Sequence, residues 1–312
     1  MDADRMLVFT SVLLGSGLVA SVPLLLAALG ETFAERAGLL NLGIEGMMLI
    51  GSFVGFLAAL NTESIYFGLA SGLLIGMLLG FMFGLTTITL HVDQIIVGLG
   101  TTVFASGITG FLFRELYGRR FPSLSVSIPK VAVPLLSEIP VIGPAFFKQQ
   151  VIVYSTWVLV LIMAFVLDHT SFGLRIRAVG ESPLAADAAG VNVARVRYCA
   201  ILIGGGLAGL GGAFLAVGDL SFFVPGMTVG QGFIAIAIAM LGKWRPRRVF
   251  VGALLFGILR SVSNGLQILH INIRPELTLM LPYLGIILAL VVLAGRTTLP
   301  AALGIPYQRG ER

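Results

Sequence analysis

The sequence predicts an all-α integral membrane protein, a polytopic bundle of roughly eight to ten transmembrane helices with broken or re-entrant segments among them. Composition is the first observation behind this prediction. Of the 312 residues, 57% are hydrophobic and 11% are charged, and the mean hydropathy is +1.00, whereas about 25% of the residues of a soluble domain are charged. The second observation is that apolar runs of about 20 residues, the length of a helix that crosses a bilayer, recur along the chain.

The apolar runs follow one another with short connections, so residues 1–312 are expected to form a single transmembrane domain. The runs long enough to cross are Met6–Leu29, Ile65–Leu90, Ile95–Phe113, Val151–Leu167, Ala200–Val217, Phe250–Leu269 and Leu277–Ala294. The run Gly46–Leu60 is short, and Gly232–Leu241 is shorter still. At about 1.5 Å per residue, Gly232–Leu241 is too short to cross, so it is expected to be re-entrant or part of a longer broken helix.

Basic residues between the runs orient the protein in the membrane, so the net charge of +5 does not indicate a nucleic-acid partner. Segment 168–198 holds four arginines and is therefore predicted to be cytoplasmic, as are segment 242–248 and the tail from Arg296. This topology makes 114–150 an external loop, although it also carries basic residues. The side of the amino terminus stays open.

Within the cytoplasmic segment, the residues predict a short helix. Ser182 can cap it, Pro183 suits its first position, Leu184–Ala189 form its body, and Gly190 provides a left-handed stop. A short helix held between two spans is suited to pressing on a partner below the membrane. The alternative is an ordinary surface loop.

Two further segments have polar or small residues on one helical face. In Ile65–Leu90, glycines recur every fourth residue and predict close packing against another helix: Gly68, Gly72, Gly76, Gly80 and Gly84. In Glu31–Glu45, a helix would carry Glu31, Glu35, Asn41 and Glu45 on one face and apolar side chains on another. This second segment is either an interfacial helix or the lining of a central cavity, and whether it crosses, re-enters or lies flat stays open.

The run Phe250–Leu269 carries a polar stripe formed by Arg260, Asn264 and Gln267. Such a stripe faces the interior of a helix bundle or water. It either hydrogen-bonds a polar solute or ties helices together, and Arg260 could instead extend to the interface.

Motifs for catalysis are missing from the sequence. There is no G-x-x-x-x-G-K-[ST] loop, and the histidines and the one cysteine form no metal-binding cluster, so no metal is expected. The pattern Gly204-x-Gly206-x-x-Gly209 lies inside an apolar run without a preceding strand, so it is not a dinucleotide site. The chain is predicted not to be an enzyme.

The stretch ETFAERAGLLNLGIEGMMLIG strongly resembles the signature of the membrane permeases of bacterial ABC importers of the simple-sugar and branched-chain amino-acid type. Its matching residues are Glu35, Gly38, Asn41, Leu42, Gly43, Glu45 and Gly46. The later stretches VDQIIVGLG, LRIRAVGESPLAADAAGVNV and PGMTVGQGFIAIAIAMLGKWRP match in order, so the resemblance covers most of the chain. Its wording looks most like the nucleoside-importer branch, which also includes riboflavin permeases.

This resemblance implies a multi-pass permease subunit in the bacterial cytoplasmic membrane. Its partners would be an ABC ATPase, a second permease that is identical or paralogous, an external solute-binding protein and membrane lipid. ATP and Mg²⁺ would be bound by the ATPase, and this chain would need no cofactor. The coupling segment that docks on the ATPase would include Gly180, Glu181, Ser182, Pro183, Ala186 and Gly190.

A nucleoside needs a few amides or carboxylates among apolar walls, so we expect Asn41, Glu45 and Asn264 to border the solute pathway, with Gln94 as a fourth residue. The alternative is that these side chains only bond to neighbouring helices. Riboflavin and simple sugars are alternative solutes. From another class, an ion-coupled secondary transporter stays open, because Glu45 and the short Gly232–Leu241 run fit the broken-helix sites of such proteins.

Overall fold

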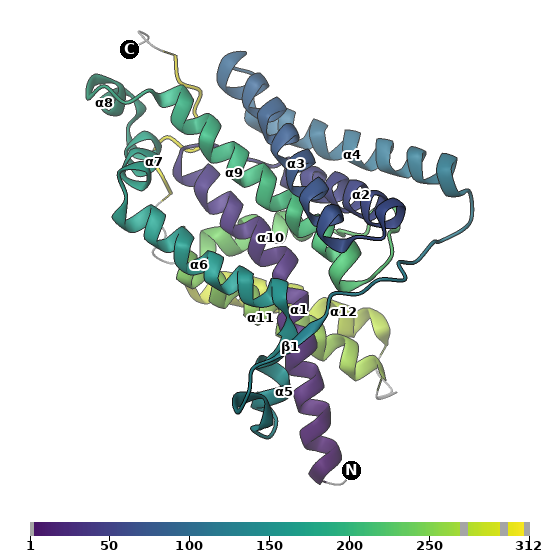
Figure 1. Cartoon of the computed structure of the whole chain (residues 1–312). Helices are drawn as coiled ribbons and strands as arrows, with labels where there is room; N and C mark the ends of the chain where they lie inside the picture. The colour runs from purple at the N-terminus through teal and green to yellow at the C-terminus, as the bar shows by residue number, and fades with distance from the viewer. Residues whose placement is uncertain (1–2, 269–273, 294–298, 309–312) are drawn as a thin grey trace.

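The structure is a computed structural model that describes residues 3–268, 274–293 and 299–308, and these residues form a bundle of helices with two short strands at one end (Figure 1). In chain order, the elements are α1 (Ala3–Arg36), α2 (Ile44–Thr62), α3 (Ile65–Gly84), the π-helix η1 (Leu85–Thr89), α4 (Gln94–Tyr117), β1 (Lys130–Ala132), the 3₁₀-helix η2 (Leu136–Glu138), α5 (Ile142–Phe146), β2 (Lys148–Gln150), α6 (Val151–His169), α7 (Ser171–Glu181), α8 (Pro183–Ala188), α9 (Val193–Phe214), the π-helix η3 (Leu215–Asp219), α10 (Gln231–Leu241), α11 (Pro246–Ile268) and α12 (Pro275–Leu293). Within the described residues, seven helices are long and apolar enough to cross a membrane, and α10 and α12 add shorter apolar segments. The predicted all-α membrane fold is confirmed.

Helices α3 and α9 pack together through their glycines. A Cβ atom added to Gly76 would lie 2.2 Å from the carbonyl oxygen of Gly205, and one added to Gly80 would lie 2.6 Å from the carbonyl oxygen of Ile201. Distances this short leave no room for a side chain, so the two backbones touch directly. The predicted packing role of the glycine face is confirmed.

The segment Glu31–Glu45 is not one helix, and the prediction of two faces along it is wrong. Helix α1 ends at Arg36, the chain turns at Gly38 with a φ of 84°, and α2 begins at Ile44. A Cβ atom at Gly38 would also lie 2.9 Å from the carbonyl oxygen of Ala302, so the turn is tightly enclosed. The segment is therefore a buried connection between two spans, and it neither crosses the membrane by itself nor lies flat on it.

Residues 220–241 form a broken span. After η3, the chain runs without regular helix to Gly230, and α10 then completes the return. Part of the irregular stretch is buried: Phe223 is 0% exposed, and its ring lies 5.1 Å from the ring of Phe53 on α2 and 5.4 Å from that of Phe113 on α4, whereas Val229 is 69% exposed. Irregular backbone at membrane depth is tolerated where protein covers it. The predicted re-entrant or broken character of Gly232–Leu241 is confirmed.

The two ends of the bundle differ. One end carries α7, α8 and the Gly242–Arg248 turn, which the positive-inside rule assigns to the cytoplasm. The opposite end carries α5 and the β1–β2 pair, and the first turns of α1 lie beside α5 there (Figure 1). With the orientation predicted from the basic residues, the amino-terminal end of α1 is expected on the external side. Helix α4 runs on to Tyr117, so the external loop begins at Gly118 and not at Arg114 as predicted.

Candidate solute pathway and coupling surface

Buried polar side chains surround the turn between α1 and α2. Glu31, Glu35 and Asn41 are all 0% exposed. The backbone nitrogen of Asn41 donates to Glu31 Oε1 at 3.2 Å, so the carboxylate on α1 holds the returning chain. The second oxygen of Glu31 has no hydrogen-bond partner among the described residues. Burying a polar group costs free energy unless hydrogen bonds replace water, so the contact from Asn41 offsets only part of the cost of burying this carboxylate.

Two side chains tie the same turn to the rest of the bundle. Trp244, between α10 and α11, donates its indole N–H to Glu35. Arg197 on α9 is 2% exposed, and its Nε donates to the carbonyl oxygen of Ala37 at 3.2 Å. The end of α1 is therefore linked to both α9 and the α10–α11 turn.

Glu45 closes the amino-terminal end of α10. Its carboxylate accepts hydrogen bonds from the Thr228 hydroxyl at 2.6 Å, the Gly230 backbone nitrogen at 2.9 Å and the Gly232 backbone nitrogen at 2.7 Å. A helix amino terminus has N–H groups without intrahelical partners and a partial positive charge, so a carboxylate there is stabilising. In this conformation, both oxygens of the Glu45 carboxylate accept hydrogen bonds from groups of the protein itself.

Asn41 and Gln94 keep polar atoms without partners. Gln94, at the start of α4, is 3% exposed, and its Oε1 accepts from the Leu40 backbone nitrogen at 2.7 Å. Gln94 Nε2 and Asn41 Oδ1 have no hydrogen-bond partner among the described residues. A buried polar atom without a partner costs about 1–3 kcal/mol. Each of these two residues thus keeps one buried polar atom that forms no hydrogen bond with the described residues in this conformation.

Asn264 is not brought together with the other three expected pathway residues. It is exposed on α11 and forms no hydrogen bond with Asn41, Glu45 or Gln94 in the described part of the chain. Its neighbour Gln267 donates to Thr278 on α12 at 3.0 Å. For Gln267, the structure thus favours the second alternative, in which the polar stripe ties helices together.

The expected coupling helix is present as α8. Ser182 Oγ accepts from the Ala185 backbone nitrogen at 3.3 Å, Pro183 is the first helical residue, and Gly190 has a φ of 84°. These local features are as predicted. Glu181, Ser182 and Gly190 are exposed and Pro183 is half-buried, so they lie on the outer surface.

Two of the expected coupling residues need correction, because they face the interior of this chain. Ala186 is 4% exposed. Gly180 is buried, and a Cβ atom there would lie 2.0 Å from the carbonyl oxygen of Arg36. In this conformation, both residues pack mainly against the rest of the chain, and Ala186 also reaches the floor of the adjacent groove.

Helix α7 and the groove beside it were not predicted from the sequence. Thr170 caps α7 by accepting from the Gly173 backbone nitrogen at 3.2 Å, a signal present in the sequence. Between α7, α8 and the start of α9 lies a groove of about 800 Å³ whose lining residues are Ser171, Leu174, Arg175, Ala178, Glu181, Ser182, Ala185, Ala186, Ala189, Gly190, Val191, Asn192, Arg195 and Val196. This groove and the exposed face of α8 together form one continuous cytoplasmic surface.

Comparison with known proteins shows which protein family this chain is similar to. The family model for the branched-chain amino acid transport system permease component matches residues 13–290. The chain is 37% identical to the guanosine ABC transporter permease protein NupQ of Bacillus subtilis, over 97% of this chain and 98% of that protein. It is 36% identical to the nucleoside ABC transporter permease protein NupC of Lactococcus lactis, over 96% and 98%.

A third relative is named for a different solute. The chain is 38% identical to the putative glucose ABC transporter permease protein TsgC13 of Haloferax volcanii, over 86% of this chain and 82% of that protein. No solved structure matches the chain.

Proposed function

Because the chain belongs to the family of permease components of branched-chain amino acid transport systems, we propose that it is the membrane-spanning subunit of an ABC importer whose solute is a nucleoside. It is a multi-pass protein of the cytoplasmic membrane. The observation that carries the choice of solute is the similarity, along nearly the whole length, to two permeases whose names specify guanosine or nucleosides.

A simple sugar is the second candidate solute, because the relative TsgC13 is a putative glucose permease. A nucleoside contains a ribose, so the two solute classes share a polyol that would need hydrogen-bonding groups. They differ in the base, which offers a flat apolar face and a polar edge. In the region of Asn41 and Gln94, a purine would find two amide groups among apolar side chains.

Uptake by the assembled importer tests the choice of solute. The permease would be reconstituted in vesicles with its ATPase, its second permease and its solute-binding protein, and uptake of radiolabelled guanosine, uridine, glucose and riboflavin would be compared. We expect guanosine or uridine to accumulate when ATP is supplied. Glucose or riboflavin uptake without nucleoside uptake would show that the solute is another one, and uptake without ATP would contradict the importer class.

Coupling to the ATPase is proposed for α8 and the exposed edge of the adjacent groove. Glu181, Ser182, Pro183 and Gly190 would form the contact, and the buried Ala186 and Gly180 would hold the helix on the bundle. A movement of α8 driven by the ATPase would be transmitted to the end of α1, since Gly180 and Arg36 are in direct backbone contact. ATP and Mg²⁺ would be bound only by the ATPase, and this chain would hydrolyse nothing.

The second permease subunit is proposed to cover α4. Of the residues in the most apolar stretch of α4, 17% are buried, against 72% for α2. Its outward face combines large apolar side chains, such as Val103 at 73% and Phe104 at 60% exposure, with Gly100 and Gly107, whose added Cβ atoms would meet nothing within 4 Å. Small residues let helices approach closely in lipid. An external solute-binding protein would deliver the nucleoside at the opposite end from α8.

A further inference from the structure

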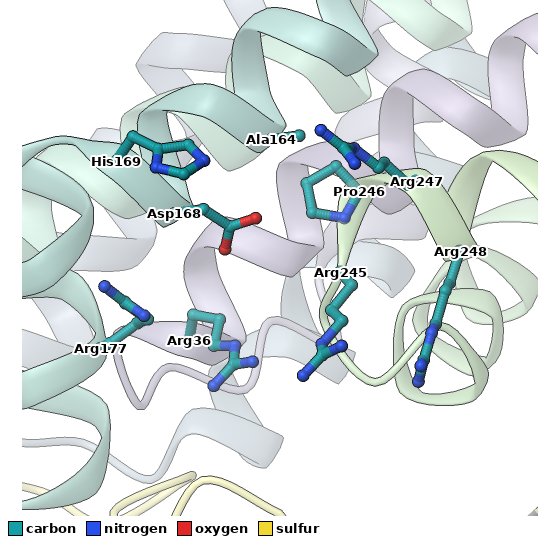
Figure 2. A pocket seen from close by; sticks show the side chains of 9 residues that line it. All are labelled: Arg36, Ala164, Asp168, His169, Arg177, Arg245, Pro246, Arg247 and Arg248. Atoms are coloured by element: carbon teal, nitrogen blue, oxygen red, sulfur yellow. The ribbon is translucent and has the colours of Figure 1, made fainter.

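Arginines from three separate parts of the chain line one pocket of about 530 Å³ at the cytoplasmic end of the bundle (Figure 2). Arg36 comes from the end of α1 and Arg177 from α7, and the other three come from the turn before α11 and from its first residues. The full lining is Arg36, Ala164, Asp168, His169, Arg177, Arg245, Pro246, Arg247 and Arg248.

Positive charge in this pocket is not balanced by the described residues that line it. The lining contributes the carboxylate of Asp168 and the guanidinium groups of all five arginines. In Figure 2, the guanidinium groups of Arg36, Arg177 and Arg245 lie on one side of Asp168. Arg36 is attracted by Asp168 and by nearby Glu181, and repelled by Arg177 and Arg245. Arg177 Nε is buried and has no hydrogen-bond partner among the described residues. The pocket therefore favours an anion.

A second, mostly apolar groove, also lined by Lys243, adjoins the arginine pocket at Arg248. It has a volume of about 470 Å³, lies between α10, α11 and α12, and shares Arg248 with the arginine pocket. Along its wall, Val251 is 63% exposed and Leu255 is 47% exposed, and Leu259 and Ile286 lie farther along. A ligand that fills both volumes must have an anionic end and an apolar chain.

We propose that these adjoining pockets bind one anionic phospholipid of the cytoplasmic leaflet, with its phosphate among the arginines and an acyl chain along α11. Guanidinium groups bind phosphate oxygens in a bidentate manner, and basic pockets at the cytoplasmic side of membrane proteins bind anionic headgroups. A soluble anion would leave the apolar groove empty, so a lipid fits the two volumes better. This inference does not depend on which solute is transported.

Bound lipid would also hold the α10–α11 turn in place. Arg245 and Arg248 directly follow the re-entrant helix α10, whose other end is bonded to Glu45. The lipid would thus fasten the cytoplasmic end of a helix that enters the bundle from the external side. Loss of the lipid should lower the thermal stability of the assembled importer and its coupled ATPase rate.

Photolabelling of the complete importer tests the site. The complex would be placed in phosphatidylcholine nanodiscs containing a phosphatidylglycerol with a photoreactive acyl chain, and labelled peptides would be mapped by mass spectrometry. We expect labels at Val251, Leu255 and Leu259. The double variant Arg245→Gln, Arg248→Gln should reduce this labelling by about fivefold for each arginine removed. The matched control is Arg119→Gln, Arg120→Gln in the exposed external segment, and it should leave labelling unchanged.

A second variant separates lipid binding from misfolding. Leu255→Trp keeps every arginine but fills the groove, so it should also reduce labelling in a complex that still assembles fully and elutes as a single species in size-exclusion chromatography. Equal labelling by the corresponding phosphatidylcholine would overturn the proposal, since any lipid would then suffice. Complete displacement of the lipid by inorganic phosphate would also overturn it. If the ATPase dissociated from the Arg245→Gln, Arg248→Gln importer while labelling stayed unchanged, the pocket would be a protein-docking site and not a lipid site.

Discussion

The carboxylate of Glu45 on α2 lies 2.7 Å from the backbone nitrogen of Gly232 on α10. A Cβ atom added to Gly232 would lie 2.5 Å from Glu45 Cα, so the two backbones are also in close contact. The Glu45 carboxylate and the absence of a side chain at Gly232 both stabilise this junction, because only a glycine lets the amino-terminal end of α10 come close enough to donate to the carboxylate. Any movement of α10 must therefore move α2 or break this junction.

Replacing Glu45 with alanine should destabilise the permease strongly. It would remove the acceptor of the Thr228 hydroxyl and of two backbone N–H groups, at about 1–3 kcal/mol for each buried donor left without a partner. We expect a lower melting temperature and loss of transport in purified, reconstituted protein. Glu45→Gln, which keeps one acceptor oxygen, should be intermediate. An alanine variant that melts like the wild type would show that the junction is not structural.

Substitution of Gly76 by leucine should lower the yield of folded protein. The new side chain would collide with Gly205 and Gly209 on α9, and overpacking of this kind costs about 1–3 kcal/mol or more. Detergent-extracted yield and thermal stability would be measured beside Ser71→Leu, a half-buried position on the same helix that should tolerate the change. Equal stability of the two variants would contradict the direct backbone contact.

Introduction of arginine at Ala185 should uncouple the ATPase. Ala185 is exposed on α8, whereas its neighbour Ala186 is buried and would test folding instead of docking. We expect Ala185→Arg to insert in the membrane normally and to lose solute-stimulated ATP hydrolysis by at least about tenfold, a change of roughly 1.4 kcal/mol in the docking free energy. Leu135→Arg, at an 85% exposed external position, is the matched control. Unchanged coupling in Ala185→Arg would place the docking surface elsewhere.

Cysteine accessibility should distinguish pathway residues from packing residues. After Cys199→Ala, single cysteines would be placed at Asn41, Glu45, Gln94 and Asn264 and treated with a water-soluble thiol reagent. Cysteines at positions 41 and 94 should react at rates that change with ATP and with solute, because both positions are buried in this conformation and opening of the pathway would expose them. A cysteine at position 45 should react slowly, because the backbone there packs directly against Gly232 on α10. No reaction at any of the four positions, in protein that transports, would leave only the packing role.

Enlargement of Gly107 should weaken association with the second permease without unfolding this chain. A side chain there meets nothing within 4 Å in the described residues, so Gly107→Leu should be folded and stable as a single subunit. Crosslinking and co-purification with the second permease should fall relative to Leu78→Phe, a change on an exposed position of α3. Normal co-purification would indicate that α4 faces lipid.

The spans and the glycine face were predictable because their signals are local. Hydropathy over about 20 residues identifies a span wherever the chain goes next, and glycines four residues apart must share one helix face. The cap at Ser182 and the stop at Gly190 are equally local, and both are present in α8. The sequence could therefore specify these elements before any tertiary contact was known.

The α1–α2 turn was not predictable in this way, because its causes are distant in sequence. Helical periodicity continues through Glu45, and the one local signal against a continuous helix is Gly38. The turn is held by Arg197, 160 residues away from Ala37, and by contact with Ala302. The role of Glu45 was not predictable for the same reason. A carboxylate near the membrane suggests a cavity lining, but the backbone N–H groups that donate to it lie in another span, far away in the sequence.

The junction between Glu45 and α10 also constrains the order in which the protein can be assembled during synthesis. Gly232 follows Glu45 by 187 residues, so the acceptor is made and inserted long before its donors leave the ribosome. Until then, the Glu45 carboxylate must stay hydrated or bound to something else, and α10, which is too short to be inserted as a span by its own hydropathy, has no stable place. Folding of the broken span is thus expected to be a late step of biogenesis. It can finish only after α9 has been inserted, because α9 places the following residues beside α2.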